Sequence, residues 1–253
     1  MRLNLVDIGE GSAVILLHGL FGSLSNLGGV SRHLAKDFRV ISVDLRNHGN
    51  SDHDLVMDLP SMAVDLIETL DSLNIASAAV LGHSLGGKVA MQAALNFPER
   101  VDKLIIADIS PIRYRQTQSG ALDGLMAIEK TKLNSRREAD EILSKFEADA
   151  NVRGFLLTNL VRQNSSEFRL RLNALAIAKN YFEGLMAPPF GKPYNGSTLF
   201  LKGEDSAYIQ DKHRSEISTL FPMADIQVIP KVGHWLHAED PKMFNKIVAD
   251  FLS

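Results

Sequence analysis

Short, continuous runs of apolar residues recur along this chain of 253 residues, and stretches with helical periodicity separate them. Runs this short, with no alternating polar positions, are typical of parallel strands buried on both faces of a sheet. Between two of them, residues 62–73 place Leu66, Ile67 and Leu70 on one face of a helix. The alternation predicts an α/β fold with a mostly parallel, doubly wound sheet. The predicted strands cover residues 14–17, 40–44, 78–81, 104–109, 198–201 and 226–229.

The alternation stops between Pro111 and Pro193, where the sequence predicts successive helices and no strand. Ser135 and Glu138 have the spacing of a capping box, which predicts the start of one helix, and apolar stripes along 152–160 and 172–176 predict others. Since the insertion precedes the penultimate strand, we interpret it as a helical cap. An ordinary helical subdomain on one sheet face is the alternative. The expected division is a core of residues 1–111 and 194–253 and a cap of residues 112–193.

Composition excludes several classes of function. With 27 basic and 30 acidic residues, a net charge of −3, the chain offers no electrostatic reason to expect nucleic acid or an anionic membrane as partner. Without cysteine it has no disulfide, thiolate catalysis or cysteine-ligated metal. No apolar run approaches the roughly 20 residues of a membrane-spanning helix, and no nucleotide or zinc-protease motif occurs. We expect a soluble, cytoplasmic protein that needs no cofactor or metal; its oligomeric state is not predicted.

The most informative motif is Gly82-His83-Ser84-Leu85-Gly86, between a predicted strand and a predicted helix. This is the pattern of a nucleophile elbow, a strained turn that presents the serine hydroxyl at the end of a strand. Glycines are needed because side chains at those two positions would collide with the neighbouring strand and helix. The motif predicts that Ser84 is the nucleophile of a serine hydrolase.

A serine hydroxyl needs a general base, and histidine is the usual choice. Of the eight histidines, His234 follows the last predicted strand, in the loop before the terminal helix. This gives the chain order nucleophile, acid, histidine. His237 is a rival farther along the chain, and a partly buried loop histidine without a catalytic role is the alternative for His234.

The acid has two candidates. Hydrolases with this order often carry an aspartate in a Gly-x-x-Asp turn after the strand that corresponds to 198–201, but here Ser206 occupies that position. Either Asp205 supplies the carboxylate one residue early, or Asp108 supplies it from the end of the preceding strand. A shift of one residue on an extended segment turns the side chain to the opposite face, which favours Asp108. Ser206 is then a candidate helper, with a plain turn residue as its alternative.

The oxyanion of a tetrahedral intermediate needs two N–H donors. Leu85, directly after the nucleophile, and Leu20, in the loop after the strand 14–17, are the candidates. The candidate pocket residues are Phe21, His83 and Trp235.

A second loop, residues 44–51, also lies at the carboxyl edge of a predicted strand, where α/β sheets place ligands. We expect Asp44 and Arg46 to brace this loop by an internal ion pair, and His48 to be structural. Lys88, one helical turn beyond Ser84, is expected to pack or to point into solvent without a catalytic role.

Together, His18-Gly19, Asp44-x-Arg46, the Ser84 motif and Gly233-His234 resemble the α/β-hydrolase superfamily over essentially the whole chain. Within it, the chain looks most like bacterial acyl esterases of the YbfF type, which act on acyl esters and acyl-CoA thioesters. This resemblance implies Ser84 as nucleophile, His234 as base and Asp108 as acid, with Ser206 beside them beneath a helical cap. It is weakest over residues 117–192.

We therefore expect a serine esterase that cleaves carboxylic esters, and also acyl-CoA thioesters, through an acyl-enzyme on Ser84. A C–C bond hydrolase or lyase with the same site is one alternative, because cap arginines could hold a substrate carboxylate. A non-catalytic ligand-binding protein with the same fold is the other. The cap arginines are Arg113, Arg115, Arg162, Arg169 and Arg171.

Overall fold

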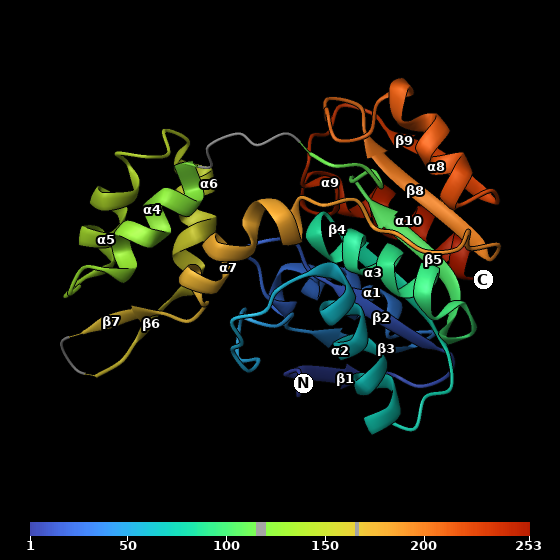
Figure 1. The fold of residues 1–253 in the computed structure, drawn as a ribbon, viewed down its shortest axis with the longest axis horizontal. Coiled ribbons are helices and arrows are strands. Elements are labelled where there is room, and N and C mark those ends of the chain that lie inside the picture. The colour runs from blue at the N-terminus through green and yellow to red at the C-terminus, as the bar shows by residue number, and fades with distance from the viewer. Residues whose placement is uncertain (115–119, 165–166) are drawn as a thin grey trace.

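The computed structural model describes residues 1–114, 120–164 and 167–253. Its centre is a seven-stranded sheet in the order β1-β3-β2-β4-β5-β8-β9 (Figure 1). Neighbouring strands are parallel except β1, which is antiparallel to β3, so the predicted fold class is confirmed. The strands are β1 Leu5–Ile8, β2 Ala13–Leu17, β3 Arg39–Val43, β4 Ala78–His83, β5 Val101–Ala107, β8 Ser197–Gly203 and β9 Ala224–Ile229.

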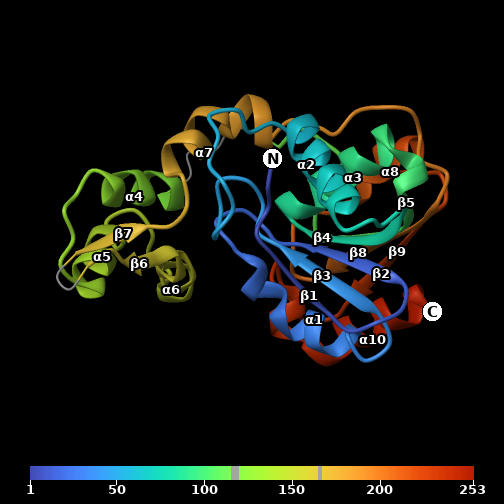
Figure 2. The ribbon, with the colours of Figure 1, turned by 90° about the horizontal axis from the view of Figure 1, so that it is seen from below.

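Helices cover both faces of this sheet, with α2, α3 and α8 on one face and α1 and α10 on the other (Figure 2). Successive strand residues point to opposite faces, so Ile15 and Leu17 of β2 join one buried apolar cluster, whereas Val14 and Leu16 join the other. This two-sided burial explains why the strands are continuous apolar runs. The core helices are α1 Gly28–Leu34, α2 Leu59–Ser72, α3 Leu85–Asn96, α8 Arg214–Leu220, α9 Leu236–Glu239 and α10 Pro241–Leu252.

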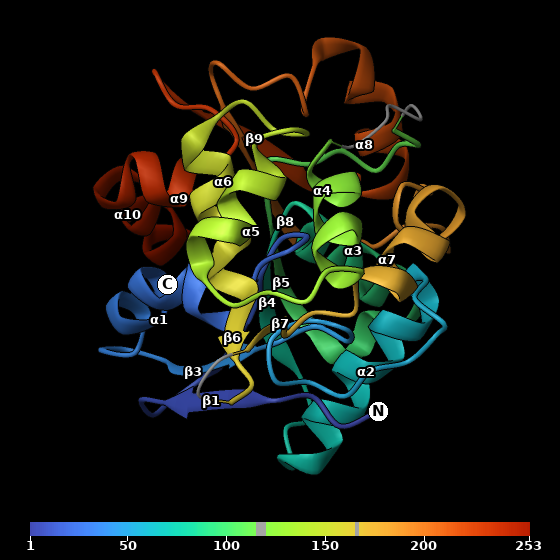
Figure 3. The same cartoon turned by 90° about the vertical axis from the view of Figure 1, so that its left-hand side faces the viewer.

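The insertion between β5 and β8 lies to one side of the sheet, in front of the strand ends when viewed from that side (Figures 1 and 3). We call residues 112–193 the cap segment. The expectation that it holds no strand is wrong, because β6 and β7 form a short antiparallel pair. Three-residue strands are too short to show a period of two in the sequence. The cap elements are α4 Gly120–Glu129, α5 Arg136–Leu143, α6 Ala150–Leu156, β6 Leu160–Arg162, β7 Phe168–Leu170, α7 Ala174–Asn180 and the π-helical turn Tyr181–Leu185.

Other local predictions hold in part. Ser135 caps α5 by accepting from the Glu138 N–H at 3.2 Å, but the Glu138 carboxylate accepts from Asn134 N–H instead of completing the box. The prediction that the apolar residues of 172–176 share a buried face is wrong at Leu175, which is 57% exposed. The edge strand β1 is missing from the prediction because its half-exposed residues form no apolar run. Within residues 1–114, 120–164 and 167–253, no helix has both the length and the apolar character to cross a bilayer.

Candidate active site

Ser84 occupies the sharp turn between β4 and α3, with a φ of 52° and a ψ of −116°. This conformation is strained for a residue with a side chain. Both predicted collisions at the glycines are confirmed: a Cβ at Gly82 would lie 2.2 Å from the Gly86 carbonyl oxygen, and one at Gly86 would lie 2.3 Å from the Leu17 carbonyl oxygen. The first collision is with α3 and the second with β2. The turn therefore brings Ser84 to the carboxyl end of β4.

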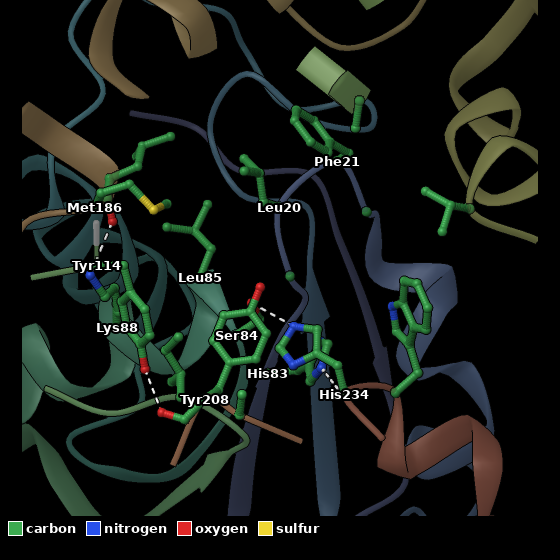
Figure 4. A pocket seen from close by; sticks show the side chains of 18 of the residues that line it. Leu20, Phe21, His83, Ser84, Leu85, Lys88, Tyr114, Met186, Tyr208 and His234 are labelled. Carbon is green, nitrogen blue, oxygen red and sulfur yellow. Dashed lines mark hydrogen bonds between the residues drawn. The ribbon is translucent and has the colours of Figure 1, made fainter. Parts of the chain in front are cut away.

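Ser84, His234 and Asp108 form a chain of hydrogen bonds. His234 Nε2 lies 3.1 Å from Ser84 Oγ, drawn as a dashed line in Figure 4, and His234 Nδ1 lies 2.7 Å from Asp108 Oδ2. His234 belongs to the loop between β9 and α9, and Asp108 directly follows β5. With the proton on Nδ1, donated to Asp108, Nε2 is free to accept the serine proton. The arrangement can support general-base activation of a hydroxyl.

Asp108, rather than Asp205, lies at the imidazole. Asp108 is fully buried, and its Oδ1 accepts from the Gly203 N–H at 3.2 Å. The Ser206 hydroxyl donates to Asp108 Oδ2, the oxygen that faces His234. Asp205 is exposed and lies outside this chain of hydrogen bonds. Ser206 therefore hydrogen-bonds to the carboxylate of this chain.

Leu20 and Leu85 both line the cavity that Ser84 opens into. Across the described residues, neither backbone N–H has a hydrogen-bond partner. Leu85 is the first residue of α3, so its N–H has no acceptor within the helix. The next N–H in the first loop, that of Phe21, is already donated to His48 Nε2 at 3.1 Å. Both the Leu20 and the Leu85 N–H group are thus free to donate at the cavity that holds Ser84.

Two buried histidines hold the loop that carries Leu20. His18 Nε2 accepts from the Leu45 N–H at 3.0 Å, and His48 Nε2 accepts from the Phe21 N–H. Each Nδ1 lies within 2.9 Å of a backbone carbonyl oxygen and carries the ring proton. Burial lowers the pKa of His18, and burial together with the nearby His18 lowers the pKa of His48 to about 3. Both rings are neutral supports of the loop, as expected for His48.

The expected ion pair between Asp44 and Arg46 is wrong. Arg46 pairs with Asp65 of α2, with its Nε 2.6 Å from Asp65 Oδ2, and both side chains are buried. Asp44 instead accepts from the Leu24 N–H at 2.7 Å and the Asn50 N–H at 2.8 Å. Asp44 therefore joins two loops, while Arg46 ties its loop to a helix.

Ser84 borders a cavity of about 1290 Å³ between the core and the cap segment. All three predicted pocket residues, Phe21, His83 and Trp235, line it. In Figure 4, Leu20 and Phe21 lie to one side of Ser84, and Lys88 and Tyr114 lie to another. A concave pocket with a predominantly apolar lining and some polar groups is the usual form of a small-molecule site. Its apolar lining includes Leu85, Val152, Phe155, Leu156, Leu185 and Met186.

His83 and His237 lie next to His234 without contacting the serine hydroxyl. His83 Nε2 lies 2.9 Å from the His234 carbonyl oxygen, and the His237 ring packs 4.6 Å from the His83 ring. Burial lowers the pKa of His83 well below its usual value, and burial lowers the pKa of His237 to about 4. His234, and not its rival His237, is therefore within hydrogen-bond distance of Ser84.

Lys88 packs, as expected, and does not reach solvent. Its side chain is 1% exposed, and its Nζ donates to the Ala187 carbonyl at 2.6 Å and the Leu185 carbonyl at 3.3 Å. The ammonium also lies 5.1 Å from the centre of the Tyr114 ring. Burial lowers its pKa to about 7. Lys88 thus fastens the end of the cap segment to α3.

A family model described as alpha/beta hydrolase fold matches residues 12–241. The chain belongs to the α/β-hydrolase family. This α/β hydrolase is 39% identical over 259 residues to the sn-1-specific diacylglycerol lipase ABHD11 of Xenopus tropicalis, covering 97% of this chain and 81% of the relative. It is 35% identical over 243 residues to Esterase YbfF of Escherichia coli (strain K12), covering 96% and 93%.

Among solved structures, a marine microorganism esterase matches this α/β hydrolase with a TM-score of 0.92 and 38% identity, covering 99% of both chains. Likeness to a YbfF-type esterase is thereby confirmed, and the protein is an enzyme of serine-hydrolase type.

Two tyrosines at the site of this α/β hydrolase were not among the predicted residues. The Tyr208 ring lies 4.1 Å from the His234 ring, and the Tyr114 hydroxyl donates to the Tyr208 carbonyl at 2.7 Å (Figure 4). Single aromatic residues in loops give no periodic signal in a sequence. For Tyr208, its place two residues after the candidate helper Ser206, in the same loop, is the signal that could have found it.

Proposed function

We infer that this α/β hydrolase cleaves carboxylic esters through an acyl-enzyme on Ser84. The observation that carries the proposal is the chain of hydrogen bonds from Ser84 Oγ through His234 to the buried Asp108, at 3.1 and 2.7 Å. The esterases and the lipase among its relatives support the same class of reaction.

In the first step, Ser84 Oγ attacks the carbonyl carbon while His234 Nε2 takes the hydroxyl proton. The negative charge that develops on the carbonyl oxygen is held by the N–H groups of Leu20 and Leu85. Asp108 keeps the proton on Nδ1 and stabilises the imidazolium, and Ser206 keeps the carboxylate in place. Collapse of the intermediate breaks the C–O bond, and His234 gives its proton to the leaving alcohol.

In the second step, water attacks the acyl-enzyme carbonyl, and His234 again serves as base. The carboxylic acid leaves and Ser84 regains its proton. Every group that this cycle needs comes from the core and from backbone N–H groups. The cycle therefore requires no metal or cofactor.

The largely apolar cavity supports an acyl group as the part of the substrate that is buried. The proposal extends to acyl-CoA thioesters, because a thioester carbonyl passes through the same tetrahedral intermediate and acyl-enzyme. We also propose a cytoplasmic enzyme in which residues 112–193 cover the site as a separate cap.

The alternative of C–C bond hydrolysis has less support. It rests on arginines that could bind a substrate carboxylate, and Arg115 lies outside the described residues. Of the other four, Arg113 lines the cavity, but it is exposed and its guanidinium lies 3.5 Å from the Glu183 carboxylate. Because an ion pair between exposed side chains is worth little, the exposed Arg113 is a weak anchor for a substrate carboxylate.

The test is hydrolysis of p-nitrophenyl acetate, butyrate and octanoate, an acyl-CoA thioester and a vinylogous diketone acid by the purified protein. We expect ester turnover that falls at least about 10³-fold in Ser84→Ala. The matched control is Ser218→Ala, which removes an exposed hydroxyl on α8 and should keep the wild-type rate. Unchanged turnover in Ser84→Ala would reject the mechanism, and turnover of the diketone alone would favour C–C hydrolysis.

A further inference from the structure

Tyr208 makes face-to-face contact with the His234 ring. The two ring centres are 4.1 Å apart, and the planes differ by 25°. The other aromatic rings near His234 are tilted and more distant: His83 at 4.8 Å and 42°, and Trp235 at 6.3 Å and 54°. Among the described residues, Tyr208 is therefore the one aromatic ring stacked on this imidazole.

The backbone of Tyr208 is fixed on both sides. Its carbonyl accepts from the Ser110 hydroxyl at 2.9 Å and from the Tyr114 hydroxyl at 2.7 Å. Its N–H donates to Ser206 Oγ at 3.3 Å, and the Ser206 hydroxyl donates to Asp108. One short loop thus fixes the carboxylate at the edge of the imidazole and the aromatic ring on its face.

We propose that Tyr208 is a positioning residue for His234: its ring holds the imidazole with Nε2 toward Ser84 and stabilises the imidazolium that forms when Ser84 loses its proton. The inference rests on the proposed function, since an imidazolium forms only if His234 acts as base. The negative face of an aromatic ring attracts a cation placed over it. No described residue hydrogen-bonds to the Tyr208 hydroxyl, so the ring and not the hydroxyl carries the effect.

The titratable groups around His234 determine how the charge of its imidazolium is balanced. Asp108, after β5, is its anionic partner at Nδ1. His83 at the end of β4 and His237 in α9 are nearby, and burial lowers the pKa of both rings, so neither adds positive charge near neutral pH. Glu239 of α9 is a second carboxylate nearby, but it accepts from the backbone N–H groups of Gly233 and Trp235. Among the described residues, Asp108 is thus the carboxylate hydrogen-bonded to the imidazole, and Tyr208 is the aromatic ring stacked on it.

The kinetic test compares Tyr208→Leu with Tyr208→Phe. A cation over an aromatic face is worth about 1–2 kcal/mol, so Tyr208→Leu should lower kcat about 5- to 30-fold. It should leave KM within about twofold and move the acid limb of the kcat/KM profile to lower pH by about 0.7 to 1.5 units. Tyr208→Phe should keep the wild-type acid limb and most of the rate. Phe190→Leu, which removes an exposed aromatic ring with no contact to the cavity, is the matched control.

A second measurement does not depend on turnover. In the NMR spectrum of histidine-labelled protein, stacking on Tyr208 should shift the His234 ring protons upfield; Tyr208→Phe should keep this shift and Tyr208→Leu should remove it. A rise in KM alone, an unchanged acid limb in Tyr208→Leu, or equal losses in the Leu and Phe variants would overturn the proposal. Unchanged turnover in Ser84→Ala would instead reject the proposed function, and the stacking itself would still be measured by NMR.

Discussion

Replacing Asp108 by asparagine removes one charge and keeps the shape of the side chain. The asparagine amide can take two orientations, and each one disrupts the hydrogen bonds of the site. With its NH₂ toward His234, the imidazole must accept at Nδ1, and Nε2 then carries the proton and cannot act as base. With its oxygen toward His234, the NH₂ faces the Gly203 N–H, which now donates to Asp108 Oδ1 at 3.2 Å. A buried donor is then left without an acceptor.

The expected loss follows from the geometry. The carboxylate contacts the imidazole at 2.7 Å, which separates the two charge centres by roughly 4 Å. At an effective dielectric constant of about 20, that pair is worth about 4 kcal/mol in the transition state, or about 10³-fold in rate. Loss of the correct tautomer adds to this, so we expect kcat to fall between about 10³- and 10⁴-fold.

The assay is steady-state hydrolysis of a p-nitrophenyl ester, with urea denaturation as a check that Asp108→Asn is folded. Asp205→Asn is the control, since Asp205 is exposed and outside the hydrogen-bond chain, and it should stay within about twofold of wild type. A kcat within tenfold of wild type for Asp108→Asn would refute the reasoning, and a large loss in Asp205→Asn would move the acid to that residue.

Three further predictions concern stability, each measured by urea denaturation. Ser84→Gly should be about 1 kcal/mol more stable than Ser84→Ala. Glycine relieves about 1–3 kcal/mol of backbone strain at this position but costs about 0.5–1 kcal/mol because the unfolded chain gains entropy. Equal stabilities of the two variants would contradict a strained elbow. Gly86→Ala, whose Cβ would lie 2.3 Å from a carbonyl oxygen, should lower the free energy of unfolding by about 2–4 kcal/mol. Gly29→Ala, with open space around its Cβ, should stay within about 1 kcal/mol of wild type. Similar effects of the two substitutions would contradict the tight contact of α3 with β2. Burial lowers the pKa of His237 to about 4, so between about pH 4 and 6.5 this residue binds a proton in the unfolded chain but not in the folded protein. The free energy of unfolding therefore falls as pH falls through that window. His237→Phe should remove about 2 kcal/mol of the fall between pH 7 and 5, and an unchanged pH dependence would argue against a neutral His237.

The fold and the centre of the site were predictable because they rest on local patterns. The strands of the core are buried on both faces, which leaves continuous apolar runs in the sequence. The elbow needs glycine at two fixed positions around Ser84, and backbone collisions explain both. Strands β1, β6 and β7 were not predicted because they are short and partly exposed.

Side-chain contacts that depend on tertiary structure were harder to predict. The sequence left Asp108 and Asp205 open because loop conformation, not strand alternation, decides which carboxylate reaches His234. Arg46 pairs with a carboxylate 19 positions away on α2 instead of one two positions away, which depends on how that helix packs. Tyr208 reaches His234 from a loop held by Ser110 and Tyr114, and no pattern within that loop encodes those contacts.

The central claim is that Ser84 is an activated nucleophile. A fluorophosphonate probe tests it directly, because only a serine whose proton can be taken by a base reacts quickly with the phosphorus. Mass spectrometry of the labelled, digested protein should find the adduct on the peptide that contains Ser84, no adduct in Ser84→Ala, and much slower labelling in His234→Ala. An adduct on another residue, or none on the folded wild-type protein, would contradict the account.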